Sequence, residues 1–371
     1  MHINHSRRIV LKLGTSTLTA GTPHLSPPRM VEIVRQVAQL HEQGYEMVLV
    51  SSGAIAAGRE RLQFPQLPKE IPAKQMISAV GQPRLMALYE QLFGLYKLTV
   101  AQVLLTRTDL SDRRRYLNSR NTLAALLNQR VIPIINENDT VATEEIRVGD
   151  NDNLSAVVAN LIEADILIML TDQQGLYTAD PNTNAEAELV RLVSDNAIPA
   201  SLWEAAGGSS GKLGVGGMWT KLQAADLARR SGSTVIIASG AAENIITRLV
   251  GGESLGTCFM PVTTALEGRK RYLLAGSSPK NVIIVDDGAA QALREGGSLL
   301  PVGVLRVSGD FERGDTVRVT DAAGVEIARG LVNYTAMDIH QICGRQSSEI
   351  SAILPFAYGD EVIHRNNMVL L

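Results

Sequence analysis

Six short runs rich in β-branched residues alternate with helical stretches over the first two thirds of the chain. Apolar strands separated by helices are typical of a mostly parallel sheet that helices cover on both faces. We therefore predict an α/β fold, a three-layer αβα sandwich with a mainly parallel central sheet. The runs are residues 7–13, 46–51, 98–105, 130–135, 165–171 and 233–239. The clearest helix between them is expected to start after Ser26, with Pro27 in its first turn, and to end at Gly44.

The pattern changes near residue 265, which indicates a second domain. From Asn281 onward the apolar runs are short and strand-like, glycine is frequent, and the DAAG stretch at 321–324 is typical of a hairpin turn. The predicted organisation is a first domain over residues 1–262, a linker over 263–279 and a small β-rich domain over 280–367.

Composition excludes several function classes. The 371 residues are 45% apolar and 20% charged, an ordinary globular mixture that is long enough for two domains. The net charge of −3 gives no reason to expect a nucleic-acid or membrane partner. No apolar run is long enough to span a membrane or to serve as a signal peptide. Cys258 and Cys343 are far apart in sequence and are expected to be free thiols. We expect a cytoplasmic protein.

Polar clusters follow the predicted strands, and in open α/β sheets ligands bind beyond the carboxyl ends of the strands. Each cluster alone could be an ordinary turn or a helix cap. A shared site is favoured because the clusters bring two lysines, several carboxylates and glycine-rich loops to one edge of the sheet. The clusters are Lys12 with 14–16, then 51–58, 136–142 with 149–153, 171–181, and 211–221.

The residue types at this edge suit phosphoryl transfer. The six histidines do not cluster and the cysteines lack metal spacing, which argues against triad chemistry and structural zinc. Residues 207–212 and 214–219 are near misses to the Walker and dinucleotide motifs, and we reject both. Phosphoryl transfer needs positioning and neutralised charge, which lysines and the N–H groups of a helix start supply. A carboxylate acceptor is already ionised at neutral pH and needs no base, although an aspartate could serve a hydroxyl acceptor as base.

Read together, several motifs resemble the amino acid kinase family, and within it the branch that phosphorylates glutamate. Near the C-terminus, residues 285–304 resemble a PUA domain, a small β-barrel-like module. The motifs of the first domain are VLKLGTSTLT (10–19), SSGAIAAGRE (51–60), AVGQPRL (79–85), LLTRTDL (104–110), VIPIINENDTVA (131–142), VGDNDNLSA (148–156), LTDQQGLYTADP (170–181) and GGMWTKLQAAD (216–226).

The resemblance implies the reaction ATP + L-glutamate → ADP + L-glutamyl 5-phosphate, the first step of proline biosynthesis, with ATP as substrate and Mg²⁺ as cofactor. It also implies feedback inhibition by proline. By motif, Lys12 and Lys221 would flank the transferring phosphoryl group, and Asp152 would hold both lysines. The residues expected to bind glutamate are Ser52, Gly53, Asp139, Asp150 and Asn151.

The resemblance also assigns nucleotide contacts to the strand ends and to the loop before the last helix of the first domain. No residue is expected to be a dedicated metal ligand, because Mg²⁺ would be held mainly by nucleotide phosphates. Trp219 has no evident second aromatic residue in the loop, and we expect its ring to pack rather than to stack on a base. The expected nucleotide-binding residues are Lys12, Gly14, Thr171, Asp172, Val215, Gly216, Gly217, Met218, Trp219, Thr220 and Lys221.

Two alternatives stay open at this point. The same fold and lysines would serve a kinase for N-acetylglutamate, aspartate or a nucleoside monophosphate, but Asp139 and Asp150 suit a free amino group better than an acetylated one. An RNA-binding role is disfavoured because residues 277–371 carry eight basic and twelve acidic side chains.

The resemblance implies partners as well. It predicts a homo-oligomer, either a dimer or a tetramer. It also predicts coupling to the next enzyme of proline synthesis, glutamate 5-semialdehyde dehydrogenase, because an acyl phosphate product is labile.

Overall fold

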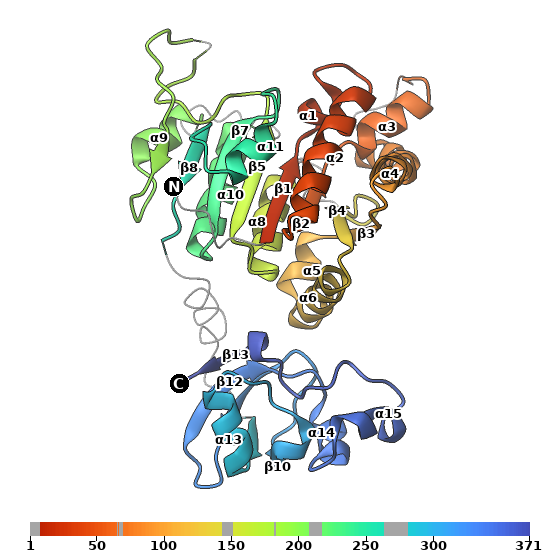
Figure 1. Cartoon of the computed structure of the whole chain (residues 1–371), viewed down its shortest axis with the longest axis vertical. Helices are drawn as coiled ribbons and strands as arrows, with labels where there is room; N and C mark the ends of the chain where they lie inside the picture. Colours follow the sequence, from red (N-terminus) through yellow and green to blue (C-terminus); the bar gives the residue numbers. More distant parts are fainter. Residues whose placement is uncertain are drawn as a thin grey trace. The chain divides into compact units, whose positions relative to one another are not determined.

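The computed structural model describes residues 8–64, 66, 70–142, 151–181, 183–207, 217–262 and 281–371. The chain forms two compact units, which are described separately below (Figure 1). The predicted linker, residues 263–279, lies outside the described residues. The boundaries of the two domains therefore stay a prediction.

The first unit is built on an eight-stranded sheet with the order β3-β4-β2-β1-β5-β7-β8-β6. Its strand pairs are parallel except for β7 with β8, so the sheet is mainly parallel, as predicted. The six predicted runs are its six longest strands. The strands are β1 (Arg8–Leu13), β2 (Glu46–Ser51), β3 (Val100–Leu105), β4 (Ile132–Glu137), β5 (Ile166–Thr171), β6 (Leu192–Val193), β7 (Thr234–Ser239) and β8 (Thr257–Phe259).

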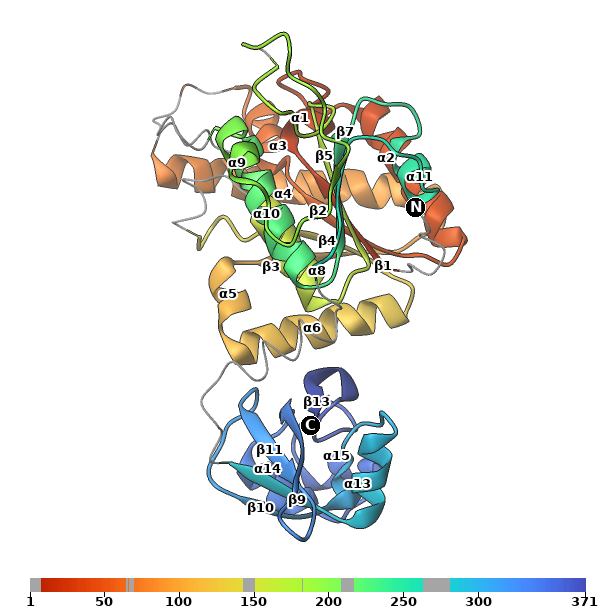
Figure 2. The same ribbon diagram turned by 90° about the vertical axis from the view of Figure 1, so that its left-hand side faces the viewer.

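Helices cover both faces of this sheet, which completes the predicted three layers. The helices α8 and α10 lie together on one face, and α2 and α11 lie on the other (Figure 2). The described helices are α1 (Thr15–Thr19), α2 (Pro27–Glu42), α3 (Ala54–Arg61), α4 (Ile71–Gly94), α5 (Arg107–Ser111), α6 (Arg113–Asn128), α8 (Asn151–Leu161), α9 (Ala200–Ala205), α10 (Met218–Arg230) and α11 (Ile245–Val250).

Helix α2 starts where the sequence predicts, but not through the expected cap. Ser26 occupies the N-cap position and Pro27 is the first helical residue, yet the Ser26 side chain makes no capping hydrogen bond. The backbone carbonyl of Ser26 accepts a hydrogen bond from the Met30 amide at 3.0 Å, and Gly44 follows the helix with a φ of +94°. The missing cap costs little here because Met30, Val34 and Val37 bury the apolar face of the helix.

Glycines let helices α3 and α4 pack in close contact. A β-carbon on Gly81 would lie 1.8 Å from the Ala54 carbonyl oxygen, and one on Gly58 would lie 1.9 Å from the Ile77 carbonyl oxygen. Gly58 lies in the predicted cluster at 51–58, and its missing side chain makes room for α4.

The second unit is a five-stranded sheet with the order β10-β9-β11-β12-β13, in which only β9 and β11 pair in parallel. The predicted hairpin turn at 321–324 joins β11 to β12, with Gly324 at a φ of +85°. The strand-like run at 360–365 forms only an isolated bridge, between Ile363 and Leu299. The elements are β9 (Val282–Val285), α13 (Asp287–Arg294), β10 (Val304–Ser308), β11 (Thr316–Thr320), β12 (Glu326–Leu331), α14 (Ala336–Ile342), α15 (Ile350–Ile353) and β13 (Met368–Leu370).

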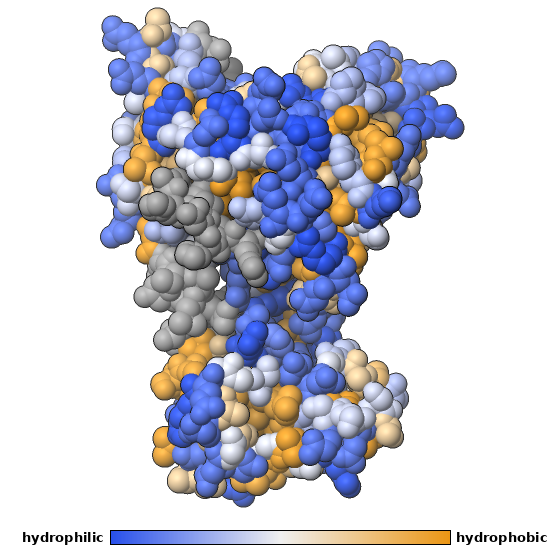
Figure 3. All heavy atoms as spheres, viewed as in Figure 1, coloured by the Kyte–Doolittle hydropathy of each residue, from blue (hydrophilic) through white to orange (hydrophobic). Residues whose placement is uncertain are grey.

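Each unit has its own apolar core. The core of the first unit combines sheet residues such as Leu11 and Ile168 with helix residues such as Val34 and Tyr89. Polar residues cover most of the surface visible in Figure 3. Within the described part of the chain, no helix combines the length and the apolar character that crossing a membrane requires.

Candidate active site

The centre of the site is the pair of strands β1 and β5, which lie side by side and in parallel at the middle of the sheet. Lys12 is the penultimate residue of β1, and helix α8 begins with Asn151 and Asp152 and packs against β1. Helix α10, which carries Lys221, packs beside α8. Residues far apart in sequence therefore meet at the carboxyl edge of the sheet, as the strand-end rule predicts.

A buried cluster of charge joins Lys12, Asp152 and Lys221. The Asp152 carboxylate is fully buried; its Oδ1 forms an ion pair with Lys12 Nζ, and its Oδ2 lies 3.2 Å from Lys221 Nζ. Both lysines are only 6% exposed. The Thr220 hydroxyl donates to the same Oδ2 at 3.0 Å. One carboxylate thus fixes two ammonium groups, and their shared charge is net positive.

A neutral network starts at the neighbouring residue, Asn151. Its Nδ2 donates to Asn136 Oδ1 at 2.9 Å and to Ser52 Oγ at 3.0 Å, with a longer contact of 3.3 Å to the Ser51 carbonyl oxygen. Asn136 Nδ2 in turn donates to Gln82 Oε1 at 2.8 Å. This network connects the ends of β2 and β4 with helix α4, and three of the predicted substrate contacts lie in it or next to it.

Asp139 lies after β4 and is held from helix α4. The Ser78 hydroxyl donates a hydrogen bond to Asp139 Oδ2. Burial raises the pKa of the Asp139 carboxyl, and the hydrogen bond from Ser78 opposes that rise. A partly buried carboxylate of this kind is a suitable partner for a substrate ammonium group.

Glycines shape the backbone at two strand ends. Gly53 caps α3 with a φ of +104°, a conformation that side chains rarely adopt, and a β-carbon there would lie 3.1 Å from Leu18 Cδ1. Gly14 caps α1, and a β-carbon there would lie 3.7 Å from Lys12 Nζ. A side chain on Gly14 would therefore stand beside the ammonium group of the charge cluster.

A cavity of about 660 Å³ lies beyond β5, next to the first residue of α10, Met218. Thr171 ends β5, and its hydroxyl donates to Asp172 Oδ1 at 2.9 Å just ahead of the segment that lines this cavity. The volume lies in the range of small-molecule sites. The lining residues come from 173–181, from α9 and the residues after it, and from Met218.

Trp219 packs against another aromatic residue, which the sequence did not reveal. Its ring centroid lies 4.8 Å from that of Trp203 in α9, in an edge-to-face arrangement. The prediction of a packing role assumed that no second aromatic residue was available, and that assumption was wrong. The pair joins α9 to the start of α10, two elements that line the cavity.

Three of the expected site residues, Asp150, Val215 and Gly216, lie outside the described residues. Of the others, Thr171 ends β5 and Asp172 follows it, and Gly217, Met218 and Trp219 form the start of α10. Lys12, Asp152, Thr220 and Lys221 form the charge cluster with Gly14 beside it. Asn151 and Ser52 are joined by a hydrogen bond, Gly53 follows Ser52 in sequence, and Asp139 is held separately by Ser78 of α4.

Sequence reasoning missed the contributions of helix α4. Ser78 and Gln82 are 3% and 8% exposed; Gln82 bonds Asn136 near the end of β4, and Ser78 bonds Asp139 just after it. A signal was present, because residues 78, 82, 85 and 89 recur at helical spacing, and Leu85 and Tyr89 are buried. Two polar residues on the buried stripe of a helix indicate hydrogen-bond partners across the core.

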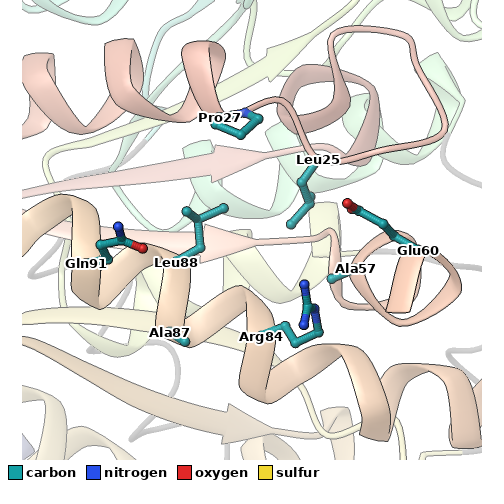
Figure 4. Close-up of a pocket in the computed structure, with 8 residues that line it drawn as sticks. All are labelled: Leu25, Pro27, Ala57, Glu60, Arg84, Ala87, Leu88 and Gln91. Carbon is teal, nitrogen blue, oxygen red and sulfur yellow. The ribbon is translucent and has the colours of Figure 1, made fainter. Parts of the chain in front are cut away.

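A second hollow of about 350 Å³ lies among α2, α3 and α4 (Figure 4). Glu60 and Arg84 reach toward it from α3 and α4, and Gln91 lies at its other end. None of the described residues of the predicted site lines this hollow. Gln91, at its edge, is an exposed glutamine on the same helix as Gln82.

Known protein families and curated relatives resemble this chain over almost all of its length. The model of the amino acid kinase family matches residues 7–239, and the model of the PUA domain matches residues 281–354. The chain is 54% identical to the glutamate 5-kinase of Photobacterium profundum, over 98% of this chain and 96% of the relative. It is 54% identical to the glutamate 5-kinase of Herpetosiphon aurantiacus, over 98% of both chains, and 52% identical to that of Deinococcus radiodurans, over 98% of this chain and 100% of the relative.

Proposed function

The chain belongs to the amino acid kinase family, and from that premise we propose that it transfers the γ-phosphoryl group of ATP to the side-chain carboxylate of L-glutamate. The product would be L-glutamyl 5-phosphate. The relatives that match almost the whole chain are glutamate 5-kinases, which supports glutamate as the acceptor.

The observation that carries the proposal is the buried carboxylate of Asp152 between Lys12 and Lys221. A migrating phosphoryl group spreads negative charge over its oxygens, and fixed positive charge stabilises that distribution. Because Asp152 already orients both ammonium groups, they need no rearrangement when the charge develops. Asp152 is therefore a positioning residue, and the two lysines are the groups that contact the transferring phosphoryl.

The chemical step needs no general base. An oxygen of the ionised glutamate side chain attacks the γ-phosphorus, the bond to the bridging oxygen breaks, and ADP leaves with that electron pair. No proton moves, because a glutamate carboxyl is ionised at neutral pH. The role of the protein is to hold the acceptor in line and to screen its charge from that of the phosphates.

The residues Ser52, Asp139 and Asn151 support recognition of an amino acid head group. Asp139 would accept from the substrate ammonium group, and the Ser52 hydroxyl, held in place by the Asn151 amide, would donate to a substrate carboxylate. An acetylated amine carries no positive charge to match Asp139, so N-acetylglutamate is a poorer fit. Asp150 is proposed to assist at the same head group.

The cavity beyond β5 would take the base and ribose of ATP, with the phosphates directed toward the charge cluster. In the part of the chain that the structure describes, no three His, Cys, Asp or Glu side chains gather as a metal site. Mg²⁺ is proposed to be held mainly by the ATP phosphates, where it would supply additional positive charge. The protein's own contribution would come from Lys12, Lys221 and the N-terminus of α10.

Several biological consequences remain part of the proposal. The reaction would open proline biosynthesis, and proline, a small zwitterion with one carboxylate, would inhibit by occupying part of the glutamate pocket. We also propose a homo-oligomer, and transfer of the labile acyl phosphate to glutamate 5-semialdehyde dehydrogenase.

The test is ADP release by the purified protein with ATP and Mg²⁺, comparing L-glutamate, N-acetyl-L-glutamate and L-aspartate. The proposal expects strong stimulation by glutamate and little by the other two acids. Equal or greater stimulation by N-acetylglutamate or aspartate would contradict the choice of substrate. Absence of ADP release with all three would contradict the activity itself.

A further inference from the structure

Helix α4 contributes a buried polar side chain, Gln82, that does not itself belong to the predicted site. It is 8% exposed and lies on the same helix face as the buried Leu85 and Tyr89. Its Oε1 accepts a hydrogen bond from Asn136 Nδ2 at 2.8 Å, while its own Nε2 has no hydrogen-bond partner among the residues that the structure describes. A buried glutamine whose acceptor is used and whose donor is idle acts in this network only as an acceptor.

The hydrogen bonds between Gln82 and Ser52 run in series, and each one fixes which end of the next amide donates. Asn136 donates to Gln82, and this turns its Oδ1 toward Asn151, whose Nδ2 donates to it at 2.9 Å. The same Nδ2 donates its second proton to Ser52 Oγ at 3.0 Å. Each amide has one acceptor end and one donor end, so reversing any single member would place two donors or two acceptors face to face.

The direction of the chain decides how Ser52 can act. Ser52 Oγ accepts from Asn151, and a hydroxyl has a single proton of its own. That proton is left to donate to a further group, and Ser52 is partly exposed at the end of β2, where the substrate is proposed to bind. A hydroxyl whose proton is left free in this way can donate a hydrogen bond to a substrate carboxylate.

We propose that Gln82 is a positioning residue that keeps Ser52 ready to donate to a substrate carboxylate, acting through Asn136 and Asn151. The role rests on the proposed phosphorylation of glutamate. Without an acceptor at position 82, Asn136 Nδ2 would be buried with no partner, and nothing would oppose a turn of the Asn136 and Asn151 amides together. After that turn Asn136 Nδ2 would donate to Asn151 Oδ1, and Asn151 would no longer present a donor to Ser52.

The test separates the acceptor of Gln82 from its donor and from its shape. Gln82→Met keeps length and volume but lacks the amide acceptor, whereas Gln82→Glu keeps an acceptor and lacks the donor. Gln91→Met is the matched control, because Gln91 is an exposed glutamine on the same helix at the edge of the hollow in Figure 4. Steady-state kcat and the KM values for glutamate and ATP are measured for each variant, together with thermal unfolding.

The expected result is a glutamate KM about 10-fold higher in Gln82→Met, the effect of one hydrogen bond to a charged group, with the ATP KM unchanged. Gln82→Glu is expected to restore most of the loss, and Gln91→Met to match the wild type. An unchanged glutamate KM in Gln82→Met overturns the proposal. Equal impairment of Gln82→Met and Gln82→Glu overturns it too, because the donor would then be the important group.

Two further outcomes locate the error. If Gln82→Met loses kcat and the affinities for both substrates in proportion to a lower melting temperature, Gln82 is merely structural and the proposal is wrong. If the wild type itself shows no glutamate-dependent ADP release, the proposed function fails, and the role of Gln82 toward glutamate fails with it.

Discussion

Asn151 and Asp152 are adjacent residues at the start of α8, yet they belong to two different kinds of site. Asp152 lies in a cluster of full charges with two lysines. Asn151 lies in a network of amides and hydroxyls with Asn136 and Ser52. Because successive residues of a helix point about 100° apart, one helix start can serve both sites. The difference suggests a division of tasks, with charge for the phosphoryl group and neutral hydrogen bonds for the amino acid.

The largest expected effect comes from removing the shared carboxylate. Asp152→Asn is expected to lower kcat by about 1000-fold or more, because neither lysine keeps an anionic partner to orient it. Steady-state ADP release measures the effect. Asp287→Asn, at an exposed position in the first turn of α13, is the control and should retain full activity.

Removing one partner of a buried ion pair also destabilises a protein. A companion variant, Lys221→Met, therefore keeps the test decisive if Asp152→Asn unfolds. It should lose kcat by a similar factor while melting cooperatively. Near wild-type turnover in a folded Lys221→Met protein would break the assignment of the charge cluster.

The next effect concerns the neutral network. Asn151→Ala removes the donor to Ser52 and Asn136 and is expected to raise the glutamate KM by about 10- to 100-fold. The change in kcat should be much smaller than that of Asp152→Asn, and the ATP KM should stay near the wild-type value. Asn128→Ala, an exposed change at the end of α6, serves as the control. A loss confined to kcat would show that the two neighbours share one task.

A smaller effect is expected at Thr220, whose hydroxyl is shared between Asp152 Oδ2 and the Gly217 carbonyl oxygen. Thr220→Val keeps the shape but removes the hydroxyl that donates to Asp152, and it should lower kcat by about 5-fold. Thr220→Ser keeps the hydroxyl and should remain within about 2-fold of the wild type. The prediction is wrong if the two variants behave alike, or if the glutamate KM changes rather than kcat.

The smallest effect is a shift in pH dependence at Asp139. Its raised pKa means that the carboxyl takes up a proton at a higher pH than usual, and only its ionised form attracts the substrate ammonium group. The glutamate KM should therefore rise as the pH falls through this pKa. Ser78→Ala removes the hydrogen bond that lowers the pKa, so the acidic limb of the KM profile should move to higher pH.

The raised pKa of Asp139 also affects the stability of the free protein, and this effect depends on pH in the opposite direction. A carboxyl whose pKa is raised by folding favours the folded state at low pH, and this contribution is lost as the pH rises through the raised pKa.

The control for Ser78→Ala is Ser231→Ala, which removes a hydroxyl bonded to a backbone carbonyl at the end of α10. An acidic limb at the same pH in Ser78→Ala and the wild type would exclude Asp139 as the titrating group.

The charge cluster was the more predictable of the two sites. Lys12 ends a β-branched run, and Asp152 and Lys221 each open an apolar helix after a glycine-rich or acid-rich loop. Such residues meet at one edge of a parallel sheet for reasons of topology alone. The strands, the mainly parallel sheet and the separate C-terminal sheet follow from the same periodicity.

The neutral network was harder to predict, because it depends on the packing of helix α4. Gly58 and Gly81 let α3 and α4 pack closely, and α4 carries Gln82 and Ser78 into contact with Asn136 and Asp139. The partner of Trp219 depends in the same way on where α9 packs. Contacts of this kind are set by tertiary structure, and the local pattern carries only the hint of polar residues on a buried stripe.

The most direct measurement is a crystal structure with ADP, a planar mimic of the transferring phosphoryl group such as aluminium fluoride, and L-glutamate. The account predicts the Nζ atoms of Lys12 and Lys221 at about 3 Å from the mimic, on different sides of it, with Asp152 still between them. It predicts the glutamate head group on the side of Asn151 and Asp139. A complex in which either lysine is turned away from the mimic would contradict it.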